Sequence, residues 1–239
     1  MAESFVKLTR IDPEVVDTWE KSLFLTFDVD WACDAVLANT IDLVEEADVA
    51  ATWFVTHDTS LLKRLRANPK FELGIHPNFN FLLNSDARNG RTAEEVVSRL
   101  LAVVPEAKSV RSHSMAQNSN ILQIFVENGL THDANHFIPE QAGIELRPWQ
   151  LWNGLIKVPY FWEDDLACIY TKNTPIKDLT KRSGLKVFDF HPIHVYLNTV
   201  NLERYERTRK IHCDPVALTK HRYGGEGTRS ALETLLGLR

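Results

Sequence analysis

The sequence has few cysteines and no motif that would hold a nucleotide phosphate. Cys33, Cys168 and Cys213 form no C-x-x-C pair, so neither a disulfide framework nor a thiolate zinc site is expected. The absence of both G-x-G-x-x-G and G-x-x-x-x-G-K-[ST] argues against a nucleotide cofactor. The absence of a G-x-S-x-G elbow argues against a serine nucleophile.

Long apolar runs and dense basic blocks are also missing. The hydrophobic stretches are far shorter than the roughly 20 residues that a membrane helix requires. The N-terminal segment MAESFVKLTR lacks the apolar core of a secretory signal, so we expect a cytoplasmic protein without a membrane span. A net charge of −5 without a basic tail argues against a nucleic-acid partner.

The composition suits one large globular domain. The chain has 239 residues, of which 44% are hydrophobic and 25% charged, so a sizeable core is available. No repeat or low-complexity linker divides the sequence. We therefore expect one domain over residues 1–239, with a polar lead-in over the surface at 1–21 and a terminal helix at 228–238.

Seven segments are predicted to be strands, and segments with helical spacing separate the first of them. Alternation of strands and helices favours parallel strands joined by right-handed crossovers, which could close into a barrel. An open doubly wound sheet is the alternative. The predicted strands cover residues 23–30, 50–56, 71–76, 108–111, 130–133, 154–160 and 185–191.

The first predicted strand, LFLTFDVDWACD, leads into two closely spaced carboxylates. With a period of two, Thr26, Asp28 and Asp30 share one face of the strand. Two carboxylates on one face repel each other, and a cation or a shared proton usually offsets that cost. One interpretation is a metal ligand beside a general base. The other is a solvated turn in which Asp30 caps the following helix.

Reactive or ionisable side chains follow the carboxyl end of each predicted strand, whereas the amino ends of four of these strands carry Ser22, Ala50, Phe71 and Leu185. In parallel α/β barrels the active site is built from the carboxyl ends of the strands, so the pattern predicts one converging pocket. The side chains concerned are Asp28, Asp30, His57, Asp58, His76, Arg111, His113, Asp133, Trp162, Asp164, His191 and His194.

Carboxylates and imidazoles are the donors available in this pocket. They suit a divalent cation, with zinc the first choice and cobalt or nickel as alternatives. Asp30 and His76 are the best candidate ligands, and Asn80 would complete the set if the loop after His76 coils back. An Asx turn is the alternative role for Asn80.

Four segments resemble the motifs of the NodB-like polysaccharide deacetylases, carbohydrate esterase family 4. They are TFDVDW at 26–31, GIHPNFN at 74–80, Arg111 in VRSHSM, and DFHPIH at 189–194. Within this family the chain is most similar to the WbmS-like group, which is tied to a bacterial O-antigen locus. The resemblance implies an irregular seven-stranded (β/α) barrel, in agreement with the seven strands predicted from the pattern.

The resemblance assigns roles to the first two motifs. Asp28 matches the catalytic base, and Asp30 matches a metal ligand if Val29 is an insertion. His76 matches the next ligand, and Asn80 stands where the family has a second histidine. His113 or His57 would have to compensate for that missing imidazole.

The remaining motifs supply the arginine and the acid. Arg111 matches the residue that orients the base, and His113 replaces the usual proline two residues later. His191, followed by proline, matches the general acid. Asp133 and Asp164 both qualify as the aspartate that positions this acid.

The resemblance implies hydrolysis of an N-acetyl group on a sugar or a polysaccharide precursor, with Asp28 taking a proton from water and His191 giving one to the amine. Asp189 would hold the imidazole or support the metal, or else form a structural hydrogen bond inside the fold. His194 would either support a metal ligand or line the pocket wall. Trp162 would either face a sugar ring or pack in the core.

Two alternative functions stay open. The first is metal-dependent hydrolysis of another amide or ester, because the pocket chemistry does not name the acyl group. The second is a degenerate barrel that binds carbohydrate without turnover, which Asn80 and His113 motivate as departures from the family pattern.

Overall fold

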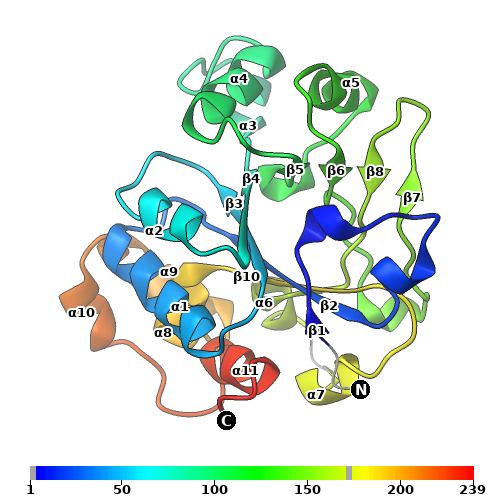
Figure 1. Ribbon diagram of the computed structural model, residues 1–239. Helices are drawn as coiled ribbons and strands as arrows, with labels where there is room; N and C mark the ends of the chain where they lie inside the picture. Colours follow the sequence, from blue (N-terminus) through cyan, green and yellow to red (C-terminus); the bar gives the residue numbers. More distant parts are fainter. Residues whose placement is uncertain (1–3, 171–173) are drawn as a thin grey trace.

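A curled sheet of ten strands forms the centre of the protein in the computed structural model, which describes residues 4–170 and 174–239 (Figure 1). The order across the sheet is β7-β8-β6-β5-β4-β3-β2-β10-β9, and β1 pairs with β2 beside this path. All pairs are parallel except β7 with β8. The strands are β1 Ser4–Phe5, β2 Ser22–Asp28, β3 Ala51–Val55, β4 Phe71–Ile75, β5 Ser109–Val110, β6 His132–Asp133, β7 Trp149–Gln150, β8 Ile156–Lys157, β9 Trp162–Glu163 and β10 Lys186–Phe190.

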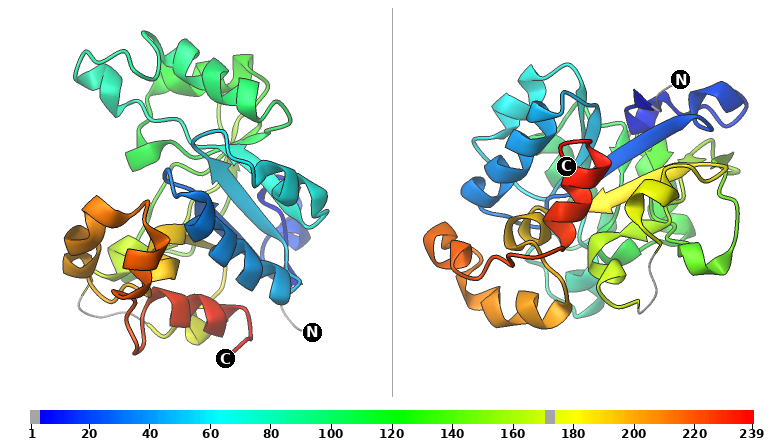
Figure 2. Two further views of the ribbon diagram at one scale, coloured as in Figure 1. Left: turned by 90° about the vertical axis from the view of Figure 1, so that its left-hand side faces the viewer. Right: turned by 90° about the horizontal axis from the view of Figure 1, so that it is seen from below.

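Helices cover the outside of the curled sheet. Figures 1 and 2 show α4 and α5 together at one end, with α1 and α8 to α11 grouped at the other. Helix α8 packs against α1 and α11. The helices are α1 Asp34–Glu46, α2 Leu62–Ala67, α3 Asn80–Leu83, α4 Ala93–Val103, α5 Ser119–Glu127, α6 Asp164–Ala167, α7 Ile176–Leu179, α8 Pro192–Leu197, α9 Leu202–Thr208, α10 Pro215–Thr219 and α11 Thr228–Leu235.

The predicted α/β class is confirmed, and each of the seven predicted strands is present. The curled sheet is a half-barrel and not a closed barrel. Its two end strands, β9 and β7, do not pair with each other within the described residues. This architecture is consistent with the irregular (β/α) barrel expected from the resemblance. The fold therefore directs the carboxyl ends of β2, β4, β5 and β10 toward one another.

Two connecting segments differ from the prediction. Residues 4–21 were expected to pass over the surface, but Leu8, Ile11 and Trp19 are buried and β1 extends the sheet. In the sequence, polar residues surround these apolar side chains, so no periodic pattern indicates that they are buried. The sequence pattern leaves room for a hairpin in the long connection at residues 162–184; the described part instead contains β9, which pairs in parallel with β10, and the short helices α6 and α7.

Strand β2 is buried on both faces, as expected for a central strand of a parallel sheet. On one face, Phe27 stacks on Trp53 with ring centroids 4.2 Å apart. On the other face, Thr26 and Asp28 point toward the polar groups of neighbouring strands. The predicted alternation is therefore present, with polar rather than apolar side chains filling the inside of the half-barrel.

Candidate active site

Side chains from five segments meet in a cavity of about 160 Å³ at the carboxyl ends of the strands. They come from the loops after β2, β4, β5 and β10 and from the segment that contains β9. The cavity is lined by Asp28, Asp30, His76, Arg111, Ser112, His113, Ser114, Met115, Tyr160, Glu163, Asp165, Leu166 and His191. The convergent pocket predicted from the strand ends is thus present.

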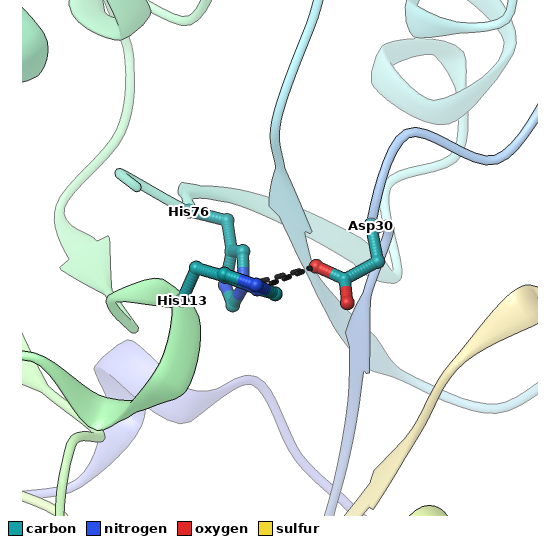
Figure 3. Close-up of side chains that lie close together, drawn as sticks. All are labelled: Asp30, His76 and His113. Carbon is teal, nitrogen blue, oxygen red and sulfur yellow. Dashed lines mark hydrogen bonds and ion pairs between the residues drawn. The ribbon is translucent and has the colours of Figure 1, made fainter. Parts of the chain in front are cut away.

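Asp30, His76 and His113 (Figure 3) form one of three groups of possible metal ligands among the described residues, the other two being Asp28 with Asp189 and His191, and Glu163 with Asp165 and His191. Asp30 Oδ1 lies 3.2 Å from His76 Nε2 and 3.1 Å from His113 Nδ1. The two imidazole nitrogens are 3.4 Å apart. All three atoms therefore face one point between the side chains.

Backbone geometry places each of the three side chains. Asp30 lies two residues beyond the end of β2 and has a φ of 42°, in the left-handed region. The backbone N–H of His76 donates to Val55 O, 2.8 Å away, and that of His113 donates to Pro77 O, 2.9 Å away. The loop after β5 is thereby tied to the loop after β4, which brings the two imidazoles together.

The three residues fit one divalent cation. Ligand atoms arranged tetrahedrally at about 2.0–2.2 Å from a zinc ion are roughly 3.3–3.6 Å apart, close to the three separations found here. Burial favours the neutral form of Asp30, but hydrogen bonds from His113 and His76 hold its pKa well below the usual value. A carboxylate and two imidazoles are typical ligands of a catalytic zinc with an open fourth position.

Asp28 lies beside this group and is paired with Arg111. Asp28 Oδ1 is 3.1 Å from Arg111 Nη1, and its Oδ2 is 3.6 Å from His76 Nδ1. Arg111 is 1% exposed. Burial alone would lower the pKa of this guanidinium, but Asp189 and Asp28 raise it. Arg111 is therefore a permanent cation that is paired with the carboxyl group of Asp28.

Arg111 also binds groups on both sides of Asp28. Its Nη1 donates to Asp189 Oδ1 and to Thr26 Oγ1, and its Nε donates to Ala134 O at 3.1 Å. The guanidinium lies between the rings of Phe54 and Tyr160, with its Cζ 4.7 and 4.3 Å from their centroids. These contacts fix the direction from which Arg111 reaches Asp28.

Asp189 is fully buried and contacts Arg111 rather than the imidazole of His191. Thr26 Oγ1 donates to Asp189 Oδ1 at 2.6 Å. Burial raises the pKa of Asp189 to about 7, although Arg111 opposes this shift. Of the roles considered for Asp189, the structure supports an interior hydrogen bond that holds Arg111.

His191 is held by Asp164. Its Nδ1 lies 2.7 Å from Asp164 Oδ1, and its backbone N–H donates to Asp164 Oδ2 at 2.9 Å. Its Nε2 points into the cavity and lies 3.7 Å from Asp30 Oδ2. Burial would lower the pKa of His191, but the carboxylate of Asp164 raises it well above the usual value.

Asp133 does not contact His191. Its Oδ2 accepts from Lys157 Nζ at 2.7 Å, and its Oδ1 accepts from the backbone N–H of Asn135 at 2.8 Å. Asp133 and Lys157 are both fully buried. Of the two aspartates that the sequence left open, the structure therefore brings Asp164 to the imidazole and places Asp133 in an ion pair between β6 and β8.

Asn80 is outside the group that fits the cation. Its Nδ2 donates to Ser114 Oγ at 3.0 Å, and its backbone N–H donates to Asn78 Oδ1 at 2.9 Å. The second contact is an Asx turn formed by the side chain of Asn78, whereas the sequence offered such a turn as a role for the side chain of Asn80 itself. His113, one of the two histidines that would replace the missing imidazole, occupies the third position instead.

His194 and Trp162 are not among the residues that line this cavity. His194 Nδ1 is 3.1 Å from Thr199 Oγ1, and the ring stacks on Tyr205 with centroids 4.7 Å apart. Trp162 is 8% exposed and packs against Phe190, with centroids 4.7 Å apart. The core-packing alternative for Trp162 agrees with this position.

The sequence did not single out several residues that line the cavity, notably Glu163 and Asp165. Both flank Asp164 in the run WEDD, so the run of three carboxylates was the available signal. Tyr160 Oη donates to Glu163 Oε2 at 3.1 Å. Burial, followed by the charges of Asp165 and Asp189, raises the pKa of Glu163 well above its usual value.

Comparison with known proteins agrees with this arrangement. Residues 25–209 match the family model described as WbmS-like polysaccharide deacetylase. A crystal structure from Bordetella bronchiseptica is 46% identical in sequence, with a TM-score of 0.93 and 98% of each chain covered. That protein is assigned as a polysaccharide deacetylase involved in O-antigen biosynthesis.

More distant similarity extends to a family 4 carbohydrate esterase from Streptomyces lividans, at 12% identity over 90% of this chain and 88% of that one, with a TM-score of 0.48. The sequence matched none of the curated proteins with which it was compared. No helix in residues 4–170 or 174–239 is long and apolar enough to cross a membrane. The family match and the near-complete overlap with the Bordetella structure show that this chain belongs to the WbmS-like polysaccharide deacetylases.

Proposed function

We propose that this protein is a metal-dependent hydrolase that removes an N-acetyl group from a sugar or a polysaccharide precursor. The observation that carries the proposal is the position of Asp30, His76 and His113 around one point, with Asp28 next to His76 and His191 next to Asp30. A water and an acyl group held at that point would lie near both a proton acceptor and a proton donor.

Asp30, His76 and His113 would hold the cation, with zinc as the first choice and cobalt or nickel as alternatives. A bound divalent cation would lower the pKa of a water molecule and polarise the acyl carbonyl. The set provides three protein ligands, which leaves room for water and substrate.

Asp28 would act as the general base. Its Oδ1 is engaged by Arg111, whereas its Oδ2 faces His76 at the edge of the cavity. Arg111 fixes one carboxylate oxygen in place, and the other would accept a proton from the attacking water. The water oxygen then bonds to the acyl carbon.

His191 would act as the general acid. The carboxylate of Asp164 binds Nδ1, raises the pKa of the imidazole, and leaves Nε2 facing the cavity with its proton. Transfer of that proton to the amide nitrogen makes the nitrogen a neutral leaving group as the C–N bond breaks. The products are acetate and the free amine of the sugar.

The test is release of acetate from N-acetylated sugars by the purified protein supplied with zinc, cobalt or nickel. The Asp28→Asn variant should bind as much metal as the wild type but release acetate at least 100-fold more slowly. Asp17→Asn, which alters a carboxylate that is 88% exposed, is the matched control and should behave as the wild type. Full activity of Asp28→Asn would exclude the base assignment.

The same experiment separates the alternative functions. Turnover of a panel of other amides or esters, with no acetate from N-acetyl sugars, would indicate a different acyl substrate. Binding of metal and sugar without turnover would indicate a carbohydrate-binding barrel.

A further inference from the structure

Glu163, Asp165 and His191 form a second group of possible metal ligands in the lining of the cavity. Each offers one oxygen or nitrogen atom, and the three atoms lie within 4.8 Å of one another. Glu163 and Asp165 flank Asp164, the residue that binds His191, so the pairing of β9 with β10 brings these side chains together. Carboxylate oxygens and imidazole nitrogens are common ligands of zinc, so this group matches the needs of a divalent cation.

Each of the three side chains has an atom left for a ligand. Glu163 Oε2 accepts from Tyr160 Oη at 3.1 Å, and Asp165 Oδ1 accepts from the backbone N–H of the next residue at 2.6 Å. The Nδ1 atom of His191 lies 2.7 Å from Asp164 Oδ1. Within the described chain, no hydrogen bond reaches Glu163 Oε1, Asp165 Oδ2 or His191 Nε2. These three atoms are therefore available to a cation.

The protein does not balance the charge of the two carboxylates. Within the described residues, neither Glu163 nor Asp165 forms an ion pair with a lysine or an arginine. Burial, followed by the charge of Asp165, raises the pKa of Glu163 well above its usual value. The third group of possible ligands differs, because Arg111 already binds Asp28 and Asp189. An added cation would thus relieve repulsion at Glu163 and Asp165, where no side-chain cation does so.

We infer that Glu163, Asp165 and His191 bind a second divalent cation, and that this cation inhibits the reaction. His191 Nε2 is the atom that would protonate the leaving amine, and a nitrogen that binds a metal ion cannot carry that proton at the same time. Binding of the cation releases the proton of Nε2, and any proton on Glu163, to solvent. The inhibitory effect rests on the proposed deacetylase function, whereas the binding of the cation does not.

The second cation should bind more weakly than the first. Its ligands include one imidazole where the first group has two, and the proton on His191 must leave before the metal binds. The two cations would also be neighbours, because Asp30 Oδ1 belongs to the first group and Asp30 Oδ2 lies 3.7 Å from His191 Nε2. Repulsion between the cations opposes the second binding event. One equivalent of zinc should therefore activate the protein, and an excess should inhibit it.

A zinc titration of the full-length protein, after metal is removed with a chelator, tests the site without substrate. Calorimetry should detect two binding events, the second roughly tenfold or more weaker than the first. A crystal soaked in excess zinc should show a second, weaker anomalous peak within about 2.0–2.2 Å of Glu163, Asp165 and His191 Nε2. Glu163→Gln combined with Asp165→Asn should remove the second event and the second peak while keeping the first.

Acetate release at one equivalent of zinc and at saturating zinc tests the inhibition. The ratio of these two rates is measured within each protein, so any effect of the substitutions on the basal rate cancels. Saturating zinc should slow the wild type about 100-fold, within the usual contribution of a general acid, but should not slow the double variant. The matched control, Glu203→Gln combined with Asp178→Asn, changes two carboxylates that are 67% and 57% exposed and should behave as the wild type.

The outcomes are distinct. A single binding event in the wild type, or a second peak away from these three residues, would overturn the inference. A double variant that excess zinc slows as much as the wild type would also overturn it, as would a second bound zinc that leaves the rate unchanged. Absence of acetate from every sugar would instead reject the proposed function and the inhibitory role with it, while calorimetry and the anomalous peak would still decide whether the second site exists.

Discussion

Asp164 holds His191 through both of its carboxylate oxygens, one on the imidazole Nδ1 at 2.7 Å and one on the backbone N–H at 2.9 Å. The aspartate begins α6, and the histidine follows β10. Because β9 and β10 pair in parallel, their carboxyl ends meet and the two residues come together. This contact determines which imidazole nitrogen faces the cavity.

Removing the charge of Asp164 should therefore alter the pH dependence of the reaction. The carboxylate raises the pKa of His191, so Asp164→Asn should lower it and move the alkaline limb of the kcat/KM profile to lower pH. We expect the maximal rate to fall about 100-fold, within the usual range for general acid catalysis.

Asp133→Asn serves as the comparison, since the sequence alone could not choose between these aspartates. It should leave the alkaline limb in place, because Asp133 pairs with Lys157 away from the imidazole. A shift of the limb in Asp133→Asn but not in Asp164→Asn would contradict the assignment.

Metal affinity should depend on His113 and not on Asn80. His113→Ala removes one of the three atoms that face the common point and should weaken zinc binding by at least 100-fold in a competitive titration with a chelator. Asn80→Ala removes a contact to Ser114 and should change the affinity by less than about threefold. The reverse order of effects would show that Asn80 is the ligand.

The buried pair of Lys157 and Asp133 should matter for stability. Lys157→Met leaves the carboxylate of Asp133 buried without its cation, which should lower the free energy of unfolding by about 3–5 kcal/mol in urea. Replacing both residues, with Asp133→Leu added, should cost less than the single change. Lys181→Met, in an exposed pair with Asp178, should cost less than about 1 kcal/mol. A larger loss in the double variant than in Lys157→Met would refute this explanation.

His194 should make the fold sensitive to acid. Burial, helped by the neighbouring charge of His191, lowers the pKa of His194 to about 3. In the unfolded chain this histidine has a pKa near 6.5. Between that pH and about pH 3, the unfolded chain therefore binds a proton on residue 194 and the folded chain does not. Stability due to this residue is present above pH 6.5 and is lost as the pH falls below it, by about 2 kcal/mol at pH 5.

Thermal and urea unfolding of His194→Gln between pH 7 and pH 5 would measure this contribution. Glutamine keeps a polar group near Thr199 but does not titrate, so the variant should lose less stability than the wild type over that interval. Equal losses in the two proteins would show that other groups cause the acid sensitivity.

The sequence predicted the fold and the location of the site better than it predicted individual contacts. The seven strands are regular in pattern, and parallel strands bring their carboxyl ends together, so Asp28, His76 and Arg111 could be placed in one pocket from sequence alone. The strand pattern could not predict that His113, and not Asn80, lies beside Asp30 and His76. That position depends on a hydrogen bond between His113 and Pro77 and on the left-handed backbone at Ser114, neither of which leaves a periodic signal.

For a similar reason, the sequence could not decide whether Asp164 or Asp133 contacts His191. Each follows a short strand, and only the order of strands in the sheet separates them. β9 lies next to β10, whereas β6 lies on the far side of β4 and β5. The burial of Leu8 and Trp19 was also invisible to a pattern search, because single apolar residues in a polar segment do not repeat.

The central claim is that Asp30, His76 and His113 together bind one catalytic cation. A crystal of the zinc-loaded protein measured at the zinc absorption edge tests this directly. The account predicts one strong anomalous peak within about 2.0–2.2 Å of Asp30 Oδ1, His76 Nε2 and His113 Nδ1. A peak held instead by Glu163 and Asp165, or a saturated crystal with no peak between the two imidazoles, would contradict it.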